Sequence, residues 1–260
     1  MLHRFLTIGM ALLAVCCSPL PAQTAASNAA TTNESGVTYY MGPVARVGQG
    51  RIRTWVSTDT AGNPLALGVS FTPGLLNELP TTDAEYQLLL PAQAAPTGFN
   101  HFALNWNPMG HFPTQIYGVP HFDFHFYTIT PTVRNQITAA GPNTALVRKT
   151  PPAGAVPPNY MYAEGGDVAH MGAHWVNRNA PELHGQPFTQ TLIYGFYNGK
   201  MAFIEPMVAL SYLQTRPYVA SSMPVPTIYP SRAYYPTGYK VAFDQSTGQY
   251  TVALYGMRLR

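Results

Sequence analysis

The sequence predicts a mainly β domain: an antiparallel sheet or barrel-like arrangement with long proline-rich loops and one or two short helices. Three observations predict this fold class, with α+β as the alternative. An Asn198-Gly199 pair separates two runs rich in β-branched and aromatic residues, and Asn-Gly is the preferred two-residue hairpin turn. Residues 121–127 alternate strictly between polar and apolar side chains, which is the period of a strand. Few segments have a helical period.

The N-terminal half contains the first predicted elements. Residues 38–47, 51–58 and 66–71 are predicted to form strands of a β-meander, because glycine-rich turns separate them. Residues 73–79 are expected to form one or two helical turns, and 86–90 and 102–106 are short apolar runs. Proline-rich loops are expected over 91–120 and 141–169, and a short helix over 131–140 with Arg134 exposed.

Two hairpins are predicted in the C-terminal part. Residues 189–197 and 200–208 flank the Asn-Gly turn, and 239–244 and 250–255 flank a turn near 246–248. Counting back from the Asn-Gly turn predicts three cross-strand pairs: Tyr197 with Lys200, Tyr194 with Phe203, and Leu192 with Glu205.

The N-terminal segment has the pattern of an export signal. A short basic start precedes an apolar stretch at residues 5–17, which is too short to span a membrane. We therefore expect a signal peptide at 1–25, a disordered linker at 26–36 and a single β-rich domain at 37–260. The expected location is periplasmic or secreted, and a lipoprotein anchored through Cys16 or Cys17 is the alternative.

Composition excludes several classes of function. Both cysteines lie in the expected signal peptide, so the mature chain has no thiolate metal ligand or cysteine nucleophile. Charged residues make up 10% of the chain and the net charge is +3 without a basic run, which argues against nucleic-acid binding. No later stretch has the length of a transmembrane helix. A small-molecule ligand and a homo-oligomer remain open as partners.

A histidine cluster is the feature that points to chemistry. Of the eight histidines, six lie between residues 101 and 174, and neutral imidazole is the commonest protein ligand for transition metals. We expect a divalent transition metal, zinc in the first instance. The predicted ligands are His111, His121, His125, His174 and Glu205. His101 and His184 are expected to have no such role.

Strand geometry limits how these residues can share an ion. Positions 121 and 125 on one strand lie about 13 Å apart, whereas neighbours at i and i+2 are only about 6.6 Å apart. Asp123 can therefore act as a ligand beside one histidine, or orient an imidazole from behind. Glu205 lies in an otherwise apolar run, and buried carboxylates need a partner. The alternatives are an ion pair for Glu205 and a polar pocket lining for the histidines.

Four segments carry a family resemblance: residues 105–111, 120–127, 171–175 and the pair 193–195 with 203–207. They resemble a domain family of unknown function among exported bacterial proteins, named after a hypothetical Thermus protein. The similarity runs from about Val37 to the C-terminus. It implies one shared domain with histidines at matching places, and it carries no established activity. The predicted ligands fall inside these motifs, and His170 lies just outside.

The leading hypothesis is a metal-binding exported protein, with a metal-dependent enzyme as its sharper form. In an enzyme the metal would activate water or polarise an oxygen-containing substrate, and Asp123 or Glu205 would move protons. The alternatives are a non-catalytic module that binds a small ligand, and an envelope structural or oligomeric protein whose histidines make buried hydrogen bonds.

Overall fold

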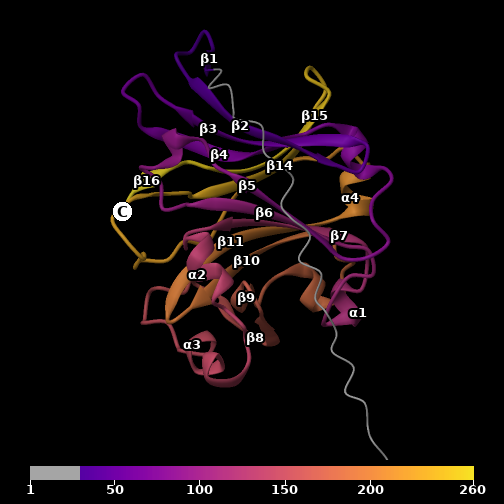
Figure 1. The fold of residues 1–260 in the computed structure, drawn as a ribbon, viewed down its shortest axis with the longest axis vertical. Coiled ribbons are helices and arrows are strands. Elements are labelled where there is room, and N and C mark those ends of the chain that lie inside the picture. The colour runs from indigo at the N-terminus through magenta and orange to yellow at the C-terminus, as the bar shows by residue number, and fades with distance from the viewer. Residues whose placement is uncertain (1–29) are drawn as a thin grey trace, which may run out of the picture.

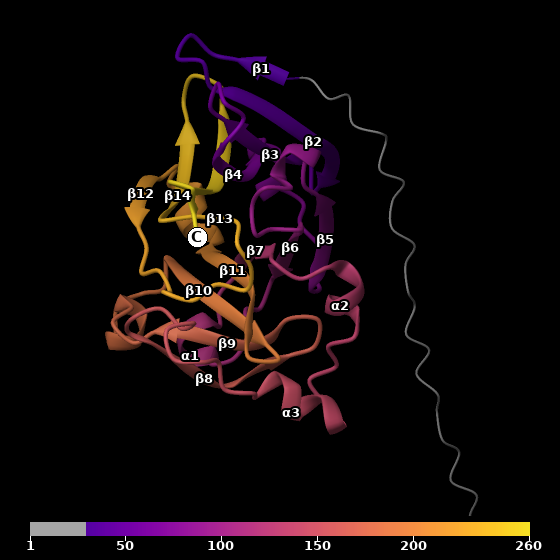
Figure 2. The ribbon, with the colours of Figure 1, turned by 90° about the vertical axis from the view of Figure 1, so that its left-hand side faces the viewer.

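Two seven-stranded antiparallel sheets stack face to face in the computed structural model, which describes residues 30–260 (Figures 1 and 2). The first sheet has the strand order β1-β2-β3-β4-β15-β14-β12, and the second has the order β5-β6-β7-β11-β10-β9-β8. Strands β13 and β16 form a separate pair. The expected signal peptide and residues 26–29 of the expected linker lie outside the described residues.

The strands of the first sheet and of the small pair are β1 (Ala30–Thr32), β2 (Thr38–Val47), β3 (Gly50–Thr58), β4 (Pro64–Phe71), β12 (Tyr218–Ser222), β13 (Tyr234–Tyr235), β14 (Gly238–Asp244), β15 (Gln249–Tyr255) and β16 (Arg258–Leu259). The strands of the second sheet are β5 (Ala84–Leu89), β6 (His101–Asn107), β7 (His121–Tyr127), β8 (Tyr160–Val168), β9 (Gly172–Asn177), β10 (Gln190–Tyr197) and β11 (Lys200–Ala209).

Only short helices connect these strands. The α-helices are α1 (Thr114–Tyr117), α2 (Pro131–Asn135), α3 (Thr144–Val147) and α4 (Leu210–Gln214). The 3-10 helices are η1 (Pro73–Leu76), η2 (Ala92–Ala94), η3 (Gly141–Asn143) and η4 (Pro181–His184). Helices α1 and α3 lie on the side of the second sheet that faces away from the first (Figures 1 and 2). No helix within residues 30–260 is long and apolar enough to span a membrane.

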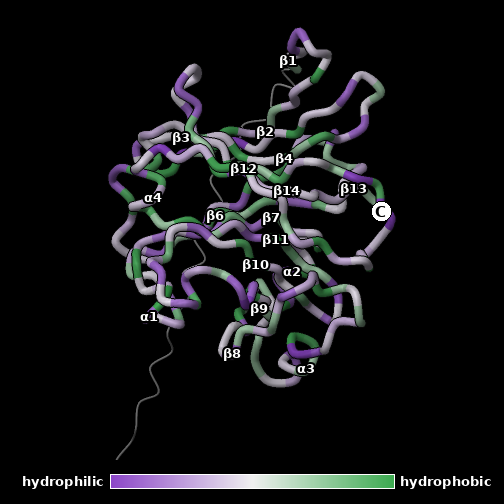
Figure 3. Tube along the Cα trace, turned by 180° about the vertical axis from the view of Figure 1, so that it is seen from behind, coloured by the Kyte–Doolittle hydropathy of each residue, from purple (hydrophilic) through white to green (hydrophobic). Residues whose placement is uncertain are grey.

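The main core lies between the two sheets. Phe122, Phe124 and Phe126 of β7 are completely buried there. The Phe124 ring packs against Phe71 of β4, with 6.1 Å between the ring centroids. In the hydropathy view, strands in the middle of the molecule carry hydrophobic stretches, and the turn beside β1 is hydrophilic (Figure 3). The phenylalanines of the alternating motif therefore pack between the two sheets, and its polar side chains lie on the opposite face of the second sheet.

The mainly β prediction is confirmed, and the structure corrects four details of it. Both sheets are open across residues 30–260, with edge strands β1 and β12 in one sheet and β5 and β8 in the other, so neither closes into a barrel. Residues 30–260 contain four α-helices of four or five residues, where one or two short helices were expected. The expected loop at 141–169 contains β8, whose alternation is hidden by a register shift between Tyr162 and Asp167. Part of the expected linker, residues 30–32, pairs with β2.

Arg134 is buried, although the sequence predicted it to be exposed. Its guanidinium pairs with the carboxylate of Glu85 and lies 5.2 Å from the centre of the Tyr127 ring. The His101 ring also stacks on the Tyr127 ring, with 4.6 Å between the ring centroids. A guanidinium with a carboxylate and an aromatic face as partners can be buried without an unpaired charge.

The β10–β11 hairpin forms around the Asn-Gly turn, but its register shifts by one residue. Tyr197 pairs with Lys200 as predicted. The predicted pairs of Tyr194 with Phe203 and Leu192 with Glu205 are wrong, because Ala202 is an extra residue in a β-bulge opposite Gly195 and Phe196. Beyond the bulge, Tyr194 pairs with Ile204, Leu192 with Pro206, and Ile193 with Glu205.

Candidate metal centre

Strand β7 provides the floor of the site. His121, Asp123 and His125 alternate with the core phenylalanines, and all three are buried on the face that points away from the first sheet. β7 lies between β6 and β11 in the middle of the second sheet. Backbone hydrogen bonds on both sides therefore fix the positions of these three side chains.

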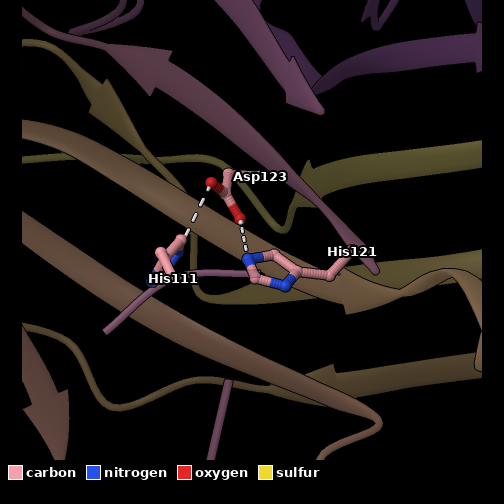
Figure 4. A group of neighbouring side chains, drawn as sticks. All are labelled: His111, His121 and Asp123. Atoms are coloured by element: carbon pink, nitrogen blue, oxygen red, sulfur yellow. Dashed lines mark ion pairs between the residues drawn. The ribbon is translucent and has the colours of Figure 1, made fainter. Parts of the chain in front are cut away.

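The first triad consists of His111, His121 and Asp123 (Figure 4). Both imidazole rings are turned toward the Asp123 carboxylate, with His111 Nε2 3.7 Å from Oδ2 and His121 Nε2 3.3 Å from Oδ1. His111 comes from the loop between β6 and α1, and 40% of its side chain is exposed. Asn107 of β6 donates a 2.7 Å hydrogen bond to Asp123 Oδ2 and so orients the carboxylate.

The second triad consists of His125, His174 and Glu205. The Nε2 atoms of His125 and His174 lie 3.6 and 3.7 Å from the two carboxylate oxygens of Glu205. The β-bulge places Glu205 opposite Ile193, so that both line the same pocket. Without the extra residue, the strand alternation would turn Glu205 toward the inter-sheet core. The bulge therefore brings this carboxylate to the histidines.

Backbone carbonyls fix the tautomers of three of the histidines. The Nδ1 atoms of His121 and His174 lie 2.7 Å from the carbonyl oxygens of Val119 and Gly166, and His111 Nδ1 lies 3.0 Å from that of Phe112. A carbonyl oxygen only accepts, so each Nδ1 must donate its proton. Each neutral ring then presents its Nε2 lone pair to a carboxylate, as metal-binding histidines do.

The distances between facing atoms fit a bound ion better than a shared proton. Three of the four imidazole–carboxylate distances exceed 3.5 Å, which is too long for a direct hydrogen bond, and the fourth is 3.3 Å. Zinc bonds of 2.0–2.2 Å to nitrogen and oxygen at tetrahedral angles place neighbouring ligand atoms about 3.4 Å apart. Within each triad the ligand atoms all lie within 4.8 Å of one another.

Several buried polar atoms of the triads have no hydrogen-bond partner among residues 30–260. These atoms are His121 Nε2, Asp123 Oδ1, both ring nitrogens of His125, and Glu205 Oε2. A buried polar atom without a partner costs about 1–3 kcal/mol. All of them except His125 Nδ1 face another atom of their triad at 3.3–3.7 Å, as the ligand atoms of a metal site would.

Burial and charge set different protonation states in the two triads. Burial lowers the pKa of His125 to about 3 and also lowers that of His174. Burial, and then the charge of Asp123, raises the pKa of Glu205 well above its usual range. Burial opposes ionisation of Asp123 too, but His111 and His121 hold the pKa of Asp123 well below its usual range.

The pKa of His111 is raised, because its interactions with Asp123 outweigh the opposing effect of burial. Ionisation is thus favoured for the carboxylate of the first triad and disfavoured for that of the second, where burial also opposes protonation of both rings. The two triads therefore differ in the protons that a cation must displace.

One pocket of about 290 Å³ opens onto both triads. His111, Asp123, His174 and Glu205 all contribute to its lining. Each triad could supply three ligands to a zinc ion, and catalytic zinc sites, unlike structural ones, have three protein ligands and leave one position open. The pocket would give small molecules access to an ion held by either triad.

The structure brings all six predicted site residues together, but in two groups instead of one. His121 and His125 fall in different triads, in agreement with the strand-spacing argument. His170 and His184 are exposed, and His184 Nε2 lies 2.8 Å from the carbonyl oxygen of Arg178. His101 is buried on Tyr127 outside both triads. Sequence reasoning missed the role of Asn107, whose only signal was its place in the motif at residues 105–111, four residues before His111.

The comparisons with known proteins give one match. Residues 59–106 match the family model described as TTHB210-like, Hypothetical protein TTHB210. The resemblance to this family of unknown function is thus confirmed over that segment, which runs from the turn before β4 to β6. The match ends before His111 and contains none of the six triad residues. No curated protein and no solved structure matches the chain.

Proposed function

We propose that this protein is an exported metal-binding protein whose two triads each bind a divalent transition-metal ion, zinc in the first instance. The observation that supports this most directly is that the Nε2 atoms of His111, His121 and His174, with tautomers fixed by backbone carbonyls, face carboxylate oxygens at 3.3–3.7 Å. Two atoms that both accept hydrogen bonds repel each other unless a cation or a proton lies between them.

We further propose that the bound ions make the pocket a catalytic site. Zinc held by two histidines and a carboxylate lowers the pKa of a bound water, which supplies a nucleophile at neutral pH. Asp123 and Glu205 each have two oxygens, so one can contact an ion while the other accepts or donates a proton. The reaction class this supports is metal-assisted hydrolysis.

Metal content of the purified chain tests the proposal. The chain, with its predicted signal peptide removed, is purified without an affinity tag or chelator and analysed by elemental analysis, before and after reconstitution with zinc. We expect about two ions per chain. Asp123→Asn and Glu205→Gln keep the shape of each side chain and remove its charge, so each variant is expected to lose about one ion.

His184→Ala is the matched control, because this histidine is exposed and lies outside both triads. It should keep the wild-type metal content. The proposal would be overturned if the wild-type chain, shown to be folded by circular dichroism, carries no metal and takes up none on reconstitution with zinc. Two bound ions without any hydrolytic turnover would leave the pocket as a metal-dependent ligand-binding site and remove the catalytic part.

A further inference from the structure

The pocket above the triads has apolar walls. Val168, Met171, Val176 and Ile193 line it on the side of β8, β9 and β10. The apolar surface continues to the solvent, since 62% of Phe112 and 38% of Val168 are exposed. Phe112 lies close to Gly165 across this opening, where a Cβ on the glycine would come within 2.8 Å of the phenylalanine ring. Exposed apolar residues that continue into a pocket are typical of a ligand-binding site.

The charged side chains of the pocket are all acidic or belong to the triads. Asp83 and Glu164 line it together with the triad residues, and no lysine or arginine is among the described residues of the lining. A ligand with a phosphate or a distal carboxylate would therefore meet carboxylates without a cationic partner on the walls.

The size of the pocket limits the ligand. A cavity of about 150 Å³ can hold benzene, so about 290 Å³ holds one ring with a short substituent. Ions bound by the triads would lie at the floor, where His111, Asp123, His174 and Glu205 meet the pocket.

We infer that the substrate or ligand is a small molecule without an anionic group on its body, with an apolar body about the size of one substituted aromatic ring and an oxygen donor at one end. The oxygen reaches the metal at the floor, and the body packs against the walls. This inference rests on the proposed function, because the oxygen needs an ion to bind.

Cobalt substitution with a series of hydroxamic acids tests the inference. Cobalt(II) reports its own binding and its ligands through visible absorption bands, and hydroxamic acids bind such ions through oxygen. Three probes share this head group and differ in the body: acetohydroxamic, benzohydroxamic and 4-carboxybenzohydroxamic acid. We expect the phenyl probe to bind at least tenfold more tightly than the methyl probe, and the added carboxylate to remove most of that gain.

Two serine variants of β8 provide a matched pair. Val168→Ser changes a residue of the pocket wall, and Met161→Ser changes a residue of the same strand with similar exposure, 41%, that is outside the lining. Val168→Ser should reduce the advantage of the phenyl probe about threefold and leave the affinity for acetohydroxamic acid unchanged. Met161→Ser should leave both unchanged.

The outcomes separate the two proposals. A folded protein without cobalt absorption bands overturns the proposed function and this inference with it. Normal cobalt bands with equal affinity for the methyl and phenyl probes, or with preference for the carboxylated probe, overturn this inference alone. Equal effects of the two serine variants also overturn it, since the gain would then not come from the pocket wall.

Discussion

Replacing Glu205 with glutamine should change stability in opposite directions with and without zinc. The Glu205 carboxyl is buried and its pKa is raised well above the ordinary value of 4.5. In the metal-free folded protein it therefore keeps its proton at a pH where the unfolded chain releases it. Its ionisation thus favours unfolding above about pH 4.5, and this destabilisation grows as pH rises until the folded carboxyl itself ionises. Glutamine has no proton to release and removes the effect.

The magnitude has an upper bound. Each pH unit between the ordinary pKa of 4.5 and the pH of measurement contributes about 1.36 kcal/mol, so at pH 7 the metal-free variant gains at most about 3 kcal/mol. Zinc reverses the order. At a thousand times its dissociation constant, an ion adds about 4 kcal/mol per filled site, and the variant forgoes this gain at the second triad. For a chain of this size that corresponds to about 8–16 °C in Tm.

Thermal unfolding followed by circular dichroism measures both effects. Wild type and Glu205→Gln are compared with chelator and with zinc, at pH 4.5 and pH 7. The variant should be the more stable protein with chelator at pH 7, nearly equal to wild type at pH 4.5, and the less stable protein with zinc at pH 7. A variant that is less stable than wild type under chelator at pH 7 would refute the argument from burial. An equal zinc-dependent gain in both proteins would refute the role of Glu205 as a ligand.

Three further predictions follow from the same contacts. Zinc binding should release protons and become tighter as pH rises, because the pKa values of His111 and Glu205 are raised and the protonated form of each must lose a proton to bind an ion. Calorimetry in buffers of different ionisation enthalpy counts the released protons, and a count of zero would contradict this prediction. Phe124→Ala, at a fully buried position between the sheets, should lower the free energy of unfolding by about 3–5 kcal/mol, as measured by urea titration. A loss below about 1 kcal/mol would show that the sheets repack without the Phe124 ring. Gly195→Ala would place a Cβ 1.9 Å from the Phe203 ring, so it should destabilise the hairpin by about 1–3 kcal/mol. It should also reduce the zinc content to about one ion per chain. Unchanged zinc content would show that the second triad does not need the bulge to bind zinc.

The sequence predicted the local elements better than their register. Strict alternation at 121–127 correctly separated the core phenylalanines from the polar face, because one buried face is enough to specify a strand. The Asn-Gly turn placed β10 and β11, but it could not reveal the bulge at Ala202. That bulge depends on the Phe203 ring lying over Gly195, a contact between two strands that no single-strand pattern records.

The site residues were predictable as a set but not in their grouping. Histidine identity and the carboxylate in an apolar strand selected the six residues of the triads. Their division into two groups depends on which strands are neighbours: β7 and β11 pair directly, while His174 reaches Glu205 from β9, two strands away from β11. The burial of Arg134 was missed for the same reason, because its partner Glu85 is 49 residues away in the chain.

The unequal anchoring of the ligands has a consequence for the rate of metal exchange. In the first triad, His121 and Asp123 belong to a central strand, whereas His111 belongs to a loop and is 40% exposed on its side chain. In the second triad the most exposed ligand, His174, is 13% exposed and lies within a paired strand. Loops open far more readily than paired strands. An ion in the first triad can thus leave by displacement of His111 alone, whereas an ion in the second must wait for β9 to separate from its neighbours. A chelator should therefore extract metal in two phases, the faster from the first triad.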